Sequence, residues 1–80
     1  MSLEWIYVLV ESLIPRLADQ GWAEWSRKLD DALRSGPTSG EILRALRERL
    51  RELQHPGLGL TKELRDDVEA VLELIRKTGF

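Results

Sequence analysis

The 80-residue chain contains no cysteine. This absence excludes disulfide bonds, thiolate zinc sites and cysteine nucleophiles. A small domain without disulfides fits a reducing compartment, so we expect a cytoplasmic location. The chain also lacks a glycine-rich phosphate-binding motif and has a single histidine. We therefore predict a protein that is not an enzyme, with no catalytic, cofactor-binding or metal-binding residues to assign.

Long apolar runs and an excess of one charge are also missing. The run WIYVLV at 5–10 is far shorter than the roughly 20 residues that span a bilayer, so we expect no membrane partner. The formal net charge is −2, which argues against sequence-independent binding to nucleic acid. Hydrophobic residues make up 42% and charged residues 32% of the chain. This composition indicates one globular domain over residues 1–80.

Extended alternation of apolar and polar residues is absent, which argues against β-strands. Breaks at 20–21, 35–40 and 55–60 separate four segments with helical periodicity. Thr38 and Thr61 stand where helix N-caps are expected. The pattern predicts an all-α fold, a compact four-helix bundle with short connections.

The first helical segment is amphipathic in spite of its apolar start. On a helical wheel, six residues form one apolar face: Leu3, Ile6, Leu9, Val10, Leu13 and Leu17. Pro15 falls on the polar face, where a proline is tolerated and bends the helix around its core. The sequence therefore predicts a first helix kinked near Pro15.

Four further apolar residues of this segment border or depart from that face: Trp5, Tyr7, Val8 and Ile14. A monomer of this size rarely exposes a large contiguous apolar patch. They are predicted to form an association surface, in a homodimer or with another helical protein. Trp22, at the start of the second helix, is assigned to the core edge or to the same contact surface. The alternative is that the first helix is the central, buried element of the bundle.

Three arginines, Arg44, Arg47 and Arg51, are placed on the face of the third segment opposite its apolar residues. Their planar guanidinium groups suit carboxylate or phosphate recognition. This stripe supports a second hypothesis, a nucleic-acid or regulatory binding protein. Glu48 and Glu52 lie beside it, however, and no aromatic residue is interleaved. A solvated surface and a docking face for an acidic protein therefore remain open as interpretations.

The last segment carries a stripe of carboxylates: Glu63, Asp66, Glu69 and Glu73. Clustered helical carboxylates can hold a divalent cation, which gives a third hypothesis, a small metal-dependent hydrolase. The stripe lies opposite the apolar face, and basic residues stand at pairing distance along the helix. A solvated face with ion pairs is the simpler interpretation. The leading hypothesis is a non-enzymatic protein–protein interaction module that self-associates through its N-terminal helix.

Overall fold

The computed structural model describes residues 3–79, and all of its regular secondary structure over that range is helical. The elements are α1 (Leu3–Asp19), α2 (Ala23–Leu33), α3 (Ser39–Leu53), the short 3-10 helix η1 (Pro56–Leu58) and α4 (Lys62–Lys77). The prediction of an all-α four-helix bundle is confirmed.

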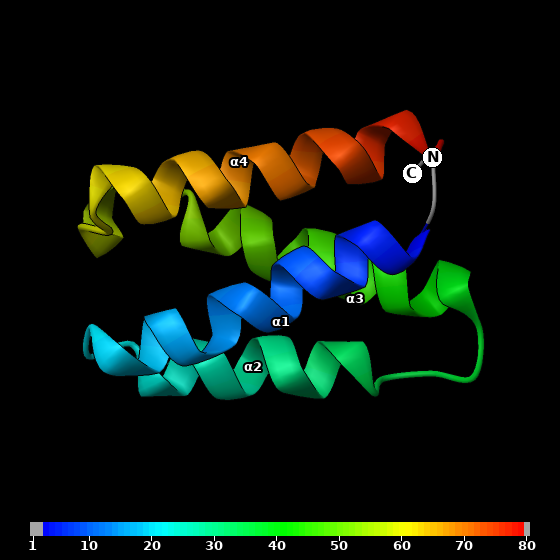
Figure 1. Cartoon of the computed structure of the whole chain (residues 1–80), viewed down its shortest axis with the longest axis horizontal. Coiled ribbons are helices and arrows are strands. Elements are labelled where there is room, and N and C mark those ends of the chain that lie inside the picture. The colour runs from blue at the N-terminus through cyan, green and yellow to red at the C-terminus, as the bar shows by residue number, and fades with distance from the viewer. Residues whose placement is uncertain (1–2, 80) are drawn as a thin grey trace.

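The four α-helices form a closed ring in which each helix packs against two neighbours. α1 packs against α2 and α4, and α3 packs against the same two helices from the other side. Consecutive helices run in opposite directions, so the start of α1 and the end of α4 lie at the same end of the bundle (Figure 1). α1 is therefore one of four equivalent walls and does not lie at the centre of the bundle.

The core lies inside this ring and is made almost entirely of aliphatic side chains. The buried residues of the three longer helices are Ile6, Val10, Leu13 and Leu17 of α1, Leu43, Leu46, Leu50 and Leu53 of α3, and Leu64, Val68, Val71 and Ile75 of α4. Their spacing of three and four residues turns one face of each helix inward. The shorter α2 adds Leu29 and Ala32.

Both predicted threonine caps are confirmed. The Thr38 hydroxyl accepts a hydrogen bond from the Glu41 amide at 3.3 Å, and the Thr61 hydroxyl accepts one from the Leu64 amide at 3.3 Å. Each bond satisfies one of the free N–H groups in the first turn of a helix. The predicted kink near Pro15 is not confirmed, because α1 continues unbroken through this exposed residue.

Two buried residues were not predicted from the sequence patterns. Ser26 is buried on α2. Leu60 is buried in the segment that connects η1 to α4. Ser26 lies one turn before Leu29 on the inner face of α2, so a small polar residue occupies a core position. No helix in the described part of the chain has the length and apolar character needed to span a membrane.

Candidate interaction surfaces

The outer face of α1 exposes two large apolar side chains. Trp5 is 59% exposed and Val8 is 50% exposed, and no other large hydrophobic residue within 3–79 is exposed. They are three residues apart, so they are neighbours on the helix surface. Ser12 and Pro15 continue the same exposed side toward the C-terminal end of α1.

The other two apolar residues that were assigned to the association surface of α1 face the rest of the chain. Tyr7 and Ile14 are half-buried and pack against the core. The Tyr7 hydroxyl is buried without a hydrogen-bond partner among the described residues. Of the four residues predicted to form an association surface, Trp5 and Val8 therefore remain available for contact.

The tryptophans of the second segment also pack within the chain. Trp22, which lies just before α2, and Trp25 are half-buried against the core. The ammonium group of Lys28 lies 4.2 Å from the centre of the Trp25 ring, a cation–π distance. Trp22 therefore lies at the core edge, one of the two placements that the sequence left open.

The arginine stripe is divided between different environments. Arg44 and Arg51 are exposed, whereas Arg47 is half-buried. The Nε atom of Arg47 is buried and has no hydrogen-bond partner in the described structure. The sequence pattern placed Arg47 opposite the core. Its half-buried side chain shows that this placement was wrong. It lies at the flank of α3, beside the groove that separates α3 from α4.

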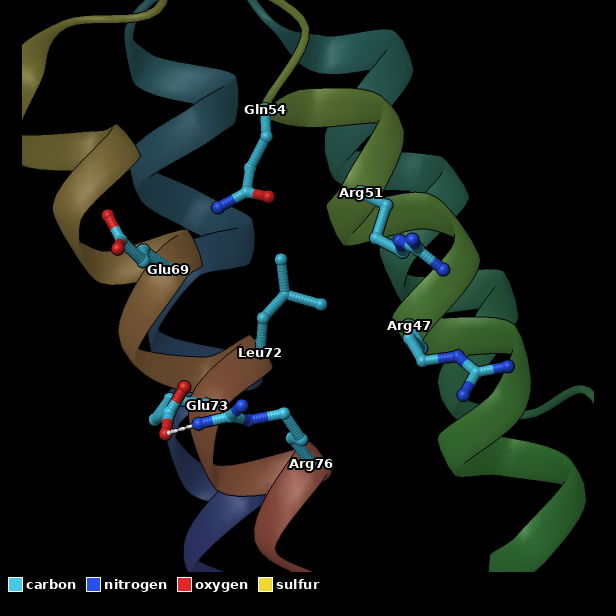
Figure 2. A pocket seen from close by; sticks show the side chains of 7 residues that line it. All are labelled: Arg47, Arg51, Gln54, Glu69, Leu72, Glu73 and Arg76. Carbon is cyan, nitrogen blue, oxygen red and sulfur yellow. Dashed lines mark hydrogen bonds and ion pairs between the residues drawn. The ribbon is translucent and has the colours of Figure 1, made fainter. Parts of the chain in front are cut away.

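A groove of about 460 Å³ runs between α3 and α4 beside this flank. Its α3 wall carries Arg47 and Arg51, and its α4 wall carries Glu69, Glu73 and Arg76 (Figure 2). Arg76 leans toward Glu73 and pairs with it, while Arg47 and Arg51 extend away from α4 (Figure 2). The groove thus carries charges of both signs, unlike the continuous positive surface that tracks a nucleic-acid backbone.

A second groove, of about 580 Å³, opens where α2 meets the end of α3 and η1. Its lining residues are Trp25, Arg51, Glu52, Gln54, His55, Gly57 and Leu58. The sequence predicted only a break between helices at 55–60, so this groove was not predicted. The signal was Leu58, an apolar residue inside that break.

His55 shapes one side of this second groove. Its Nδ1 atom accepts a hydrogen bond from the Gly57 amide at 3.1 Å and so caps η1. The side chain thus faces forward along the chain and fixes the η1 turn.

The carboxylates of α4 are largely exposed. Glu73 pairs with Arg76, three residues away on the same helix. A different carboxylate, Asp67, pairs with Arg16 of α1 at 2.6 Å. Within the described residues, no three histidine, aspartate or glutamate side chains come together in a group that could hold a metal ion.

Comparisons of the chain with protein-family models, with curated proteins and with solved structures gave no match.

Proposed function

We propose that this protein is a non-enzymatic interaction module that self-associates through the outer face of α1. The observation that supports the proposal is the exposure of Trp5 and Val8, at 59% and 50%, on neighbouring positions of one helix. Contact with a partner would remove this apolar surface from water. Tryptophan is also among the residues that contribute most to binding at protein interfaces.

The arrangement of the proposed dimer follows from where apolar surface is available. A second copy offers the same two exposed side chains and no other large ones among its described residues. Burial of Trp5 and Val8 against apolar groups of that copy therefore requires the α1 faces to meet. Such a contact uses the same patch on both subunits and has two-fold symmetry.

The size of the patch indicates a weak dimer. Complete burial of a large apolar side chain contributes about 1.5–3 kcal/mol, and roughly half of that is already realised in the monomer for Trp5 and Val8. Association costs at least about 4 kcal/mol in lost translational and rotational freedom. The four side chains of a dimer together contribute about 3–6 kcal/mol, which is close to that cost, so dimers form mainly at high protein concentration.

Charge at the edge of the patch gives this dimer a recognisable salt dependence. Glu11 is exposed one turn after Val8, so a symmetric contact brings two copies of it to the same interface. Salt screens repulsion between exposed like charges. Sedimentation equilibrium over a range of protein and salt concentrations tests this. We expect a weak monomer–dimer equilibrium that tightens as salt is added. A strictly monomeric protein at every concentration would contradict the proposal.

A further inference from the structure

We propose that the groove between Trp25, Arg51 and Leu58 binds a small apolar monocarboxylate. The groove has a volume of about 580 Å³ and is widely open to solvent, so we expect it to hold a small ligand weakly. α2, the end of α3 and η1 each contribute part of its lining. The groove is separate from the exposed face of α1, so this inference does not depend on the proposed self-association.

The walls of the groove provide an apolar surface. Trp25 and Leu58 are both half-buried and pack against the core, yet both line the groove with the part that stays accessible. An aromatic ring and a branched aliphatic side chain together suit the hydrocarbon body of a ligand. The core contacts of both residues hold this surface in place before a ligand arrives.

The wall that carries Leu58 is also fixed by its backbone. The His55 side chain binds the Gly57 amide at the start of η1. Gly59 ends the turn with a φ of +76°, a conformation that favours glycine. A lining that is fixed before binding loses less conformational freedom when a ligand is bound.

The charges around the groove leave one positive group without an ionic partner. Arg51 is exposed and forms no ion pair with any described residue. The neighbouring carboxylate, Glu52, lies 3.2 Å from Arg49 and is paired with it. Lys28, above the Trp25 ring, lies 3.6 Å from Glu24. One carboxylate from a ligand would therefore balance the charge of Arg51, and a guanidinium group can bind it through two parallel hydrogen bonds.

These features select the ligand class. A neutral apolar molecule would contact Trp25 and Leu58 but leave Arg51 unpaired. A polyanion would meet Glu52 on the same rim and gain only one basic side chain. A ligand with one carboxylate and a short aromatic or aliphatic body satisfies both the apolar walls and Arg51.

The test is an NMR titration of the ¹⁵N-labelled full chain with 3-phenylpropionate, compared with its neutral amide, 3-phenylpropanamide. We expect saturable shifts of the Trp25 indole N–H and of the Gly57 and Leu58 amides. For so small a ligand, the expected Kd is on the order of a few millimolar. The neutral amide should bind at least about threefold more weakly, because it cannot form the charged contact with Arg51.

The matched variants are Arg51→Gln and Arg44→Gln, which remove one exposed arginine each from α3. Arg51→Gln should weaken binding of the carboxylate about three- to fivefold, as expected for a partly exposed ion pair. Arg44 does not line the groove, so Arg44→Gln should leave binding unchanged. Equal affinity for acid and amide, no effect of Arg51→Gln, or shifts centred on Trp5 and Val8 would overturn the proposal, as would the absence of saturable shifts.

Discussion

Arg16 on α1 and Asp67 on α4 join two helices that are far apart in the sequence. A guanidinium nitrogen of Arg16 lies 2.6 Å from a carboxylate oxygen of Asp67. The side chains remain 39% and 45% exposed, so water and salt reach both charges. The pair therefore helps to fix how α1 and α4 meet, while the buried residues beneath it provide most of the stability.

Removal of this ion pair should have a small effect on stability. Asp67→Asn is expected to lower the free energy of unfolding by about 0–1 kcal/mol, the range for exposed ion pairs. The loss should shrink at about 1 M salt, where the Debye length falls to about 3 Å. Urea denaturation of the variant, with Asp66→Asn as the control, measures it. A loss above about 2 kcal/mol that persists at high salt would show that the pair is more important than its exposure indicates.

Truncation of a core leucine should have a much larger effect. Leu46 is fully buried on α3, and Leu46→Ala is expected to cost about 2–5 kcal/mol in unfolding free energy. The control on the same helix is Glu48→Ala, an exposed position where a change within about 0.5 kcal/mol is expected. Urea denaturation followed by circular dichroism checks both variants. A loss below about 0.5 kcal/mol for Leu46→Ala would place the inner face of α3 elsewhere.

The cap formed by His55 can be tested by retaining or removing its acceptor atom. His55→Ala removes the acceptor for the Gly57 amide and should lower the unfolding free energy by about 0.5 kcal/mol, the low end for exposed caps. His55→Asn offers a side-chain oxygen and should lose less. Hydrogen exchange at the Gly57 amide provides a local measurement. Equal protection of this amide in the wild type and in His55→Ala would contradict the cap.

The fold was largely predictable because each α-helix has a clear inner face. Leu46, Leu50 and Leu53 repeat at the spacing that turns one side of a helix inward, and all three are buried. Thr38 and Thr61 marked the starts of α3 and α4, because their hydroxyl groups satisfy first-turn amides. Periodicity and capping are local properties, and one sequence is enough to recognise them.

The surfaces were harder to predict because they depend on how the helices sit side by side. A helical wheel separates Trp5 and Tyr7 from the core face but does not show which neighbouring helix covers Tyr7. The same wheel assigned Arg47 to the solvent side, although its side chain is half-buried at the flank of α3. The groove beside Trp25 needs residues of α2, α3 and η1 together, and no local pattern in the sequence joins them.

The central claim is that the Trp5–Val8 face of α1 is a contact surface, and sedimentation equilibrium of Val8→Glu tests it most directly. Ala70→Glu is the matched control, because it adds the same charge at an exposed position on α4. We predict that the wild type and Ala70→Glu form the same weak dimer, whereas Val8→Glu remains a folded monomer at the highest concentration. A wild type that is monomeric throughout, or a Val8→Glu variant that dimerises as the wild type does, would contradict the account.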